Sequence, residues 1–345
     1  GKVEINEDIA ADGDVTIGDV DTDLVEVDAN IHGGGNVTIN ATDAGGAINI
    51  IELVSSDNGS VALEADDAIT FEPNGNVIGS DVPAGTAGVT VKAENINVKA
   101  ALHNDEGSLD LNATGTLDID QSIEAGPEGS LTLAGVALTL ATDADLTAGG
   151  DITVKNNLVL DVPGGDSTVT SEEGDITLKN VAATGVRRDL TVTAADGTVT
   201  IDSIGSDDGD DANDVNDLTI TAGNVVITNA TNGLITNGLI DGSLNITSTG
   251  DVTNTGNSLG VGLDANIAGR NVDIDGDLNV TGNIAITALQ DIGVGAATNV
   301  TAGGGIGISL TADFDGDGDG GVLMNDAGLT ATTGNVAIEG NGVLV

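Results

Sequence analysis

Aromatic side chains are nearly absent from this chain of 345 residues, which contains no Trp, no Tyr and only two Phe. Aromatic rings supply much of the area that an ordinary globular core buries. The apolar share of the chain is nevertheless 39%, so the interior must consist almost entirely of Ala, Val, Ile and Leu. We expect a core that is thin and regular. The chain also lacks Cys, which excludes disulfide bonds.

Basic residues are scarce, because 8 Lys and Arg stand against 56 Asp and Glu and give a formal net charge of −48. Nucleic acids and anionic membrane surfaces bind clustered Lys and Arg, so we expect neither as a partner. The chain has no run of 18 apolar residues, and membrane insertion is therefore not expected. The charge favours cations instead, either calcium or the high salt of a medium that screens self-repulsion.

Glycine is abundant, with 52 residues spread over the whole length, and it opens a recurrent pattern. In this pattern Gly is followed by a small polar residue, an apolar residue, any residue and a second apolar residue. It occurs far more often than the roughly two times expected by chance, with successive starts about 23 residues apart. The clearest starts are Gly13, Gly35, Gly59, Gly107, Gly129, Gly150, Gly174, Gly197, Gly223, Gly242, Gly276, Gly282 and Gly334.

Within one period, three short segments alternate apolar and polar residues and are separated by Gly, Asn and Asp. Alternation with period two turns one face of a strand inward, and the corner residues permit tight turns. The sequence therefore predicts an all-β fold, a parallel β-helix (β-solenoid) of about 15 coils with a period near 23 residues and no helix. We expect 1–345 to form a single elongated solenoid with insertion loops near 205–217 and 313–321. The side chains predicted to point inward include Val15, Ile17, Leu109, Leu111, Ile176 and Leu178.

Several repeats resemble those of a known family. The segments 250–260 (GDVTNTGNSLG), 268–274 (AGRNVDI) and 276–288 (GDLNVTGNIAITA) look like the repeats of filamentous haemagglutinin-type adhesins, which are secreted through the two-partner pathway. The secretion domain of that family has an Asn-Pro-Asn-Gly type motif, and 72–75 (EPNG) is similar except at its first position. The resemblance implies an extracellular, adhesive β-helix with a surface glycan or receptor as its partner.

The sharpest local motif is acidic. Asp313, Asp315, Asp317 and Asp319 stand at alternate positions, with Gly between the later ones. Such carboxylates, with Gly for the sharp turn, can wrap one hard cation in oxygen ligands. The sequence therefore predicts that these four residues bind calcium in a corner loop, although strand-like flanks argue against an EF-hand. A second acidic stretch, 207–217, is either a solvated insertion loop or a weak cation site.

Catalysis is not expected. Enzymes with a β-helix fold that cleave acidic polysaccharides need basic residues and a paired acid and base, whereas His32 and His103 are interpreted as exposed turn residues. Pairs such as Thr191 and Thr193 suggest an ice-binding face, but outward Thr is also favoured by its β-propensity. A polysaccharide-active enzyme and an ice-binding solenoid therefore remain the alternatives.

The sequence as a whole favours a non-enzymatic, extracellular structural or adhesive β-solenoid at a prokaryotic cell surface. It is either a segment of a haemagglutinin-like adhesin or a subunit that stacks end to end into a filament or sheath. Both terminal segments have strand-like sequences, from Val3 to Ile5 and from Val336 to Val345. We expect another copy, or the continuation of a longer chain, to stack on these end coils, and calcium or high salt to stabilise the fold.

Overall fold

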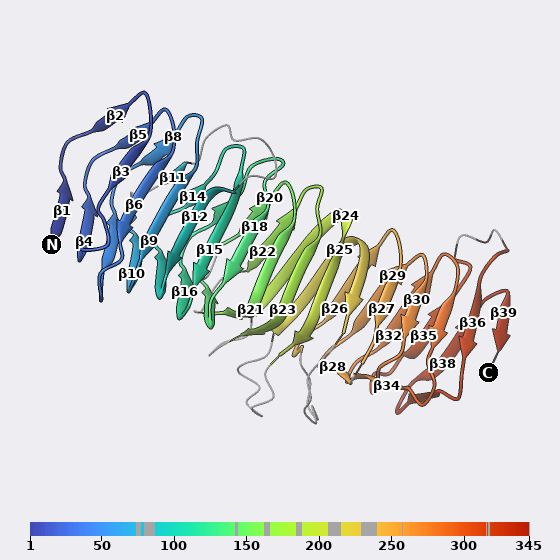
Figure 1. Ribbon diagram of the computed structural model, residues 1–345. Coiled ribbons are helices and arrows are strands. Elements are labelled where there is room, and N and C mark those ends of the chain that lie inside the picture. The colour runs from blue at the N-terminus through green and yellow to red at the C-terminus, as the bar shows by residue number, and fades with distance from the viewer. Residues whose placement is uncertain are drawn as a thin grey trace. The chain divides into compact units, whose positions relative to one another are not determined.

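The computed structural model confirms the predicted fold class. It is an all-β parallel β-solenoid of about 13 turns with a period near 23 residues, and the described part of the chain contains no helix. The strands follow one another as successive layers (Figure 1). The structure describes residues 1–73, 77–78, 87–141, 144–161, 166–183, 188–205, 215–228, 240–256, 258–314, 316 and 318–344.

The number of turns is lower than the 15 predicted from the glycine pattern, and the reason lies in where that pattern falls. Gly223 precedes a segment that pairs with β27 (Val252–Asn254), whereas Gly242 precedes β26 (Leu244–Ser248), and these two strands belong to different faces of the solenoid. The starts of the pattern therefore mark strands on more than one face. Counting them overestimates the number of coils.

The first compact unit comprises Gly1–Asp161 and Ser167–Thr177. Each coil gives one strand to each of three sides, and the strands of successive coils pair in parallel along each side. The first side contains β1 (Lys2–Ile5), β4 (Leu24–Val27), β7 (Ala47–Ile50), β10 (Ala68–Phe71), β13 (Asn95–Val98), β16 (Thr116–Ile119), β19 (Ala137–Leu140) and the second half of β21 (Ile152–Leu160). The second side contains β2 (Ile9–Ala11), β5 (Ile31–Gly33), β8 (Val54–Ser56), β11 (Val77–Ile78), β14 (Leu102–His103), β17 (Ile123–Glu124), β20 (Leu146–Ala148) and β22 (Ser167–Ser171). The third contains β3 (Val15–Ile17), β6 (Val37–Ala41), β9 (Val61–Ala65), β12 (Ala87–Ala93), β15 (Ser108–Ala113), β18 (Leu131–Ala134) and the first half of β21.

The second compact unit comprises Val162–Asp166 and Leu178–Val345, and β23 (Ile176–Ala183) begins in the first unit and ends in the second. Its first side contains the first parts of β24 (Arg188–Ile204) and β25 (Val215–Ile227), then β26, β29 (Ala265–Gly269), β32 (Ile284–Ala288), β35 (Gly307–Thr311) and β38 (Asn335–Glu339). Its second side contains the last parts of β24 and β25, then β27, β30 (Val272–Ile274), β33 (Ile292–Val294), β36 (Gly321–Met324) and β39 (Gly342–Leu344). Its third side contains β28 (Leu259–Val261), β31 (Leu278–Val280), β34 (Asn299–Ala302) and β37 (Gly328–Ala331).

The core is a set of aliphatic columns in which equivalent residues of successive coils lie in register. One column of the first unit runs through Val25, Ile48, Ile69, Ile96 and Leu117, all fully buried. Burying one such side chain stabilises the fold by about 1.5–3 kcal/mol, so a thin interior without Trp or Tyr can still hold many coils together. All six side chains predicted to point inward are buried, which confirms the predicted alternation.

The insertion loops are only partly described. The predicted loop at 313–321 lies between β35 and the start of β36, and the structure describes it except for residues 315 and 317. Most of the predicted loop at 205–217 lies outside the described residues. Positions 74 and 75 of the EPNG motif, and Val345, also lie outside them. No membrane-spanning helix is found in the part of the chain that the structure describes.

Candidate functional site

Short polar side chains at the corners tie each coil to the next. In each case the Oδ1 atom of an Asp or Asn accepts the backbone N–H that lies one coil further on, at 2.5–3.3 Å. We call this set the corner Asx ladder. It satisfies N–H groups that the strands leave unpaired at the turns. Its acceptors are Asp8, Asp14, Asn36, Asn95, Asp145, Asp151, Asp189, Asp217, Asn224, Asp264, Asn271, Asp277, Asn283 and Asp291.

Glycine makes room for these acceptors. Oδ1 of Asp264 accepts the backbone N–H of Asn283 at 2.7 Å and its side-chain amide at 3.0 Å. A Cβ on the preceding Gly282 would lie 2.3 Å from the same Oδ1. The Gly in front of the ladder residue is thus required by close approach.

The two histidines also bridge coils, and both lie in strands rather than in turns. In the first unit Nδ1 of His32 (β5) is 3.0 Å from Oγ of Ser55 (β8), and Nε2 is 3.2 Å from Oδ2 of Asp57. This composition is that of a hydrolytic triad. However, the imidazole and the carboxylate are 43% and 59% exposed, so water screens the coupling on which a triad depends. The geometry supports a tie between two coils.

His103 lies between two carboxylates. Its Nε2 is 2.6 Å from Oδ1 of Asp105, and its Nδ1 is 3.1 Å from Oε2 of Glu124 on the next coil. The second distance is that of an ion pair without hydrogen-bond geometry. These exposed contacts are screened by solvent, and they form no nucleophile–base pair.

The structure describes two of the four predicted calcium ligands, Asp313 and Asp319. The Asp313 Oδ1 atom accepts the backbone N–H of Gly318 at 3.1 Å and so closes the loop on itself, and Asp319 is exposed. Asp315 and Asp317 lie outside the described residues. Among the residues described, no cluster of three His, Asp or Glu side chains is arranged to hold a metal ion. Calcium binding by the complete loop stays a prediction.

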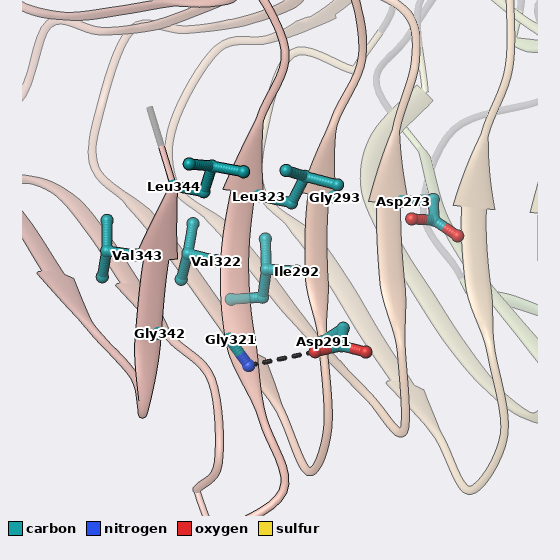
Figure 2. A pocket seen from close by; sticks show the side chains of 10 residues that line it. All are labelled: Asp273, Asp291, Ile292, Gly293, Gly321, Val322, Leu323, Gly342, Val343 and Leu344. Atoms are coloured by element: carbon teal, nitrogen blue, oxygen red, sulfur yellow. Dashed lines mark hydrogen bonds between the residues drawn. The ribbon is translucent and has the colours of Figure 1, made fainter.

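A groove of about 500 Å³ lies on the second side of the second unit (Figure 2). Leu344, Leu323, Gly293 and Asp273 occupy successive outward positions of β39, β36, β33 and β30. Gly293 has no side chain and so leaves space between its neighbours. One end of the groove is apolar, with Leu323 and Leu344 more than half exposed, and the other end is acidic.

At the acidic end of the groove, the pKa values of two carboxyl groups on neighbouring coils, Asp273 and Asp251, are shifted in opposite directions. Burial, and then the negative charges of Asp275, Asp251 and Asp291, raise the pKa of the Asp273 carboxyl. Although Asp273 as a whole is exposed, its carboxylate lies against the sheet, because a Cβ on Gly293 would be 2.4 Å from its Oδ1.

Asp251 has the opposite balance. Burial raises the pKa of its carboxyl, but hydrogen bonds from Asn271 and Arg270 outweigh burial and set the pKa below its ordinary value. The Arg270 guanidinium lies 2.9 Å from Oδ1 of Asp251. Among the described residues, Asp273 has no cationic partner of the kind that Arg270 provides for Asp251.

The first side of the second unit presents an uncharged strip to solvent. Two adjacent columns of outward positions on its first six strands contain no charged residue, and we call these two columns the neutral face. Asp189 of β24 and Asp217 of β25 lie outward just before the first column. The side chains of the neutral face are in register across the coils. One column is Thr191, Thr219, Asn245, Asn266, Ala285 and Ser309, and the other is Thr193, Thr221, Thr247, Ala268, Thr287 and Thr311.

A smaller groove of about 190 Å³ adjoins the neutral face, and we call it the Phe groove. Ala268 and Gly269 of β29, and Thr287 and Ala288 of β32, line it together with Ser248, Leu289 and Phe314. The backbone N–H of Phe314 donates to the carbonyl of Ala288 at 3.1 Å, which anchors the loop beside the sheet. The Phe314 side chain is 66% exposed.

Comparison with known proteins identifies no relative: no protein-family model, curated protein or solved structure matches this chain. The resemblance to haemagglutinin-type adhesins therefore rests on the sequence repeats alone, whereas the fold rests on the structure.

Two of these arrangements escaped the sequence analysis. Ser55 and Asp57 lie 23 and 25 residues after His32, so adding one period to each His would have found the coil-to-coil contact. The neutral face was harder to find because the spacing between its equivalent residues varies, from 19 residues (Asn266 to Ala285) to 28 residues (Thr191 to Thr219).

Proposed function

We propose that this chain is a non-enzymatic structural or adhesive β-solenoid, exposed outside a prokaryotic cell, either as a segment of a haemagglutinin-like adhesin or as a subunit of a filament or sheath. The observation that supports it best is the use of polar side chains. The corner Asx ladder, His32 and His103 are engaged between coils, and what the solenoid offers to its surroundings is a set of long, regular faces. Extended concave or flat surfaces of this kind are typical of binding and scaffolding solenoids.

The end coils support stacking as the mode of assembly. In the described residues β1 pairs with β4 alone and β39 with β36 alone, so each outer coil has an unpaired edge. Val336 and Val343 continue inward columns but are 42% and 48% exposed. Unpaired strand edges with exposed apolar side chains favour the addition of a further strand. A second copy, or further coils of a longer chain, would bury them.

Electron microscopy of the purified chain tests the assembly. If the chain is a filament subunit, rods lengthen with protein concentration, and the double variant Val336→Asp and Val343→Asp stays as single rods. Val136→Asp is the matched control, since Val136 is 73% exposed and is not in an end coil. Rods that stay single at every concentration, with the wild-type sequence, would assign the chain to a longer adhesin instead.

Two further measurements test the rest of the proposal. Antibodies against the chain should label intact cells of its source, and the chain should release no reducing ends from polysaccharides. Intracellular labelling alone would contradict the extracellular role. Release of reducing ends that is lost in Asp57→Asn or Ser55→Ala would establish the enzyme alternative.

A further inference from the structure

We propose that the neutral face, together with the Phe groove at its margin, binds a neutral polysaccharide chain. This inference rests on the adhesive function proposed above and names the class of ligand for it. The groove end of the site lies wholly within the second unit, on residues of β26, β29 and β32 together with Leu289 and Phe314.

The first argument is the state of the hydroxyl groups. Within the described residues, no hydroxyl of the neutral face is engaged in a hydrogen bond, whereas Asn266 donates to Asn245 at 3.0 Å. Some outward polar groups of the first unit are paired, for example Asn97 with Thr70 and Thr116 with Asn95. A Thr hydroxyl both donates and accepts, so a row of free hydroxyls matches the mixed donors and acceptors of sugar hydroxyls.

The second argument is charge. Charged residues make up 19% of the chain, and the net charge is −48, yet twelve outward positions in six coils contain none. The third side of the first unit, by contrast, contains Glu64, Lys92 and Asp110 at outward positions. An acidic glycan would be repelled by the molecule as a whole, and a cationic ligand would bind the acidic faces instead. The ligand that fits an uncharged face on this protein is uncharged.

The third argument is shape. In register, Ala268 lies between Thr247 and Thr287 and interrupts the column of hydroxyls with a small side chain. Phe314 stands beside this step with most of its ring exposed, in a chain that has only two Phe. An exposed ring at the side of a small apolar groove offers a stacking surface for the C–H face of a sugar, while the flanking hydroxyls bind its edges.

The same shape disfavours two other occupants. Ice and a second copy of the neutral face are both flat and extended, and a projecting ring beside a step would hold either away from the surface. A single polysaccharide chain is narrow enough to lie along the groove, which crosses three coils, a width of roughly 10 Å.

The test is calorimetric titration of the full chain with defined hexasaccharides. The probes are cellohexaose, xylohexaose, mannohexaose and laminarihexaose, with hexagalacturonate as the acidic counterpart. We expect at least one neutral hexasaccharide to bind and hexagalacturonate not to bind. Phe314→Ala should weaken that binding about tenfold or more, and Phe314→Trp, which keeps a stacking ring, should retain it.

A matched pair of variants locates the site. Ala268→Asp puts a charge in the floor of the groove and should abolish binding. Ala62→Asp makes the same change in the first unit, where Ala62 also lies outward between two Thr, Thr38 and Thr90, and should leave binding unchanged. Melting curves confirm that each variant is folded, and Phe314→Ala, an exposed loop change, remains informative even if Ala268→Asp fails to fold.

Several results would overturn the proposal. These are failure of all four neutral probes to bind, equal binding of hexagalacturonate, or equal loss in Ala62→Asp. Thermal hysteresis that Ala268→Asp removes would show that the face binds ice, and dimers that Ala268→Asp dissociates would show that it binds a second copy. If antibodies against the chain label intact cells and the chain forms rods, but it binds none of the sugars, the inference fails and the proposed function stands.

Discussion

The corner Asx ladder gives the sharpest test of how the coils are held together, and Asp264 is the residue to change. Its Oδ1 accepts two hydrogen bonds from Asn283 on the next coil, at 2.7 and 3.0 Å. Asp264→Ala removes the acceptor and leaves both donors to solvent. Asp264→Asn keeps an acceptor oxygen at the same distance along the side chain and removes only the charge.

The size of the effect follows from the exposure of the site. A hydrogen bond to a charged group contributes about 1.5–3 kcal/mol when well protected, and less where water can replace the acceptor. Asp264 and Asn283 are both half-buried, so we expect Asp264→Ala to lower the free energy of unfolding by about 1–2 kcal/mol. Asp264→Asn should lower it by less than about 1 kcal/mol, since the neutral acceptor remains.

Urea unfolding followed by circular dichroism measures these differences, with Asp273→Ala as the control in the same unit. Asp273 accepts no hydrogen bond among the described residues, and burial and neighbouring charges oppose its ionisation, so its removal should not destabilise. Gly282→Ala adds a second arm, because its Cβ would lie 2.3 Å from Oδ1 of Asp264 and 2.4 Å from the carbonyl of Leu263. In the double variant Gly282→Ala, Asp264→Ala, the clash with Oδ1 is removed, whereas the clash with the Leu263 carbonyl stays. Only part of the stability lost in Gly282→Ala should therefore be recovered. The reasoning is refuted if Asp264→Ala and Asp273→Ala shift the urea midpoint equally.

Three further predictions concern the core, pH and calcium. Leu117→Ala in a buried column should lower the free energy of unfolding by about 2–5 kcal/mol, whereas Val136→Ala at a largely exposed position should change it by less than about 0.5 kcal/mol, as urea midpoints will show. The raised pKa of Asp273 means that its ionised form is disfavoured in the folded state, so Asp273→Asn should raise the melting temperature at pH 7, and the gain should vanish as pH falls through the raised pKa. Asp251 has a lowered pKa, so Asp251→Asn should cost stability at pH 7, and the cost should disappear as pH falls through that lowered pKa; equal pH profiles for the two variants would contradict both. Millimolar calcium should raise the melting temperature relative to chelator by binding the folded loop, and Asp313→Asn with Asp315→Asn should remove that rise; an unchanged curve in the wild type would reject the site.

The fold was predictable because the information lies in short, local patterns. Alternation at positions such as Leu109 and Leu111 fixes which side of a strand is buried, and neighbouring coils impose the same requirement on the residues one period away. The number of coils was not predictable from glycine, because a Gly can precede a strand on any side of the solenoid.

The candidate site was less predictable, for a physical reason. Which outward residues become neighbours depends on the length of every corner between them, and corners tolerate insertions at little cost. Thr247, Ala268 and Thr287 come together only because successive coils of 21 and 19 residues stay in register. Phe314 joins them through a loop whose backbone bond to Ala288 has no signature in the sequence.

The charge of the chain is not explained by its fold. The corner Asx ladder uses Asp264 and Asn283 in consecutive coils, and each accepts a backbone N–H at 2.7–2.9 Å, so the ladder needs an acceptor and no charge. A net charge of −48 opposes the stacking of like coils. Attraction of cations, or solubility in salt, stays our proposal for the acidity.

The absence of charge on the neutral face is likewise not explained by the packing of the fold. Outward positions in the first unit accept Glu64, Lys92 and Asp110 without harm to the fold, so nothing in the packing forbids charge at the twelve neutral positions. Their neutrality is then a property of what meets that face, and this is why the neutral hexasaccharides are the first ligands to try.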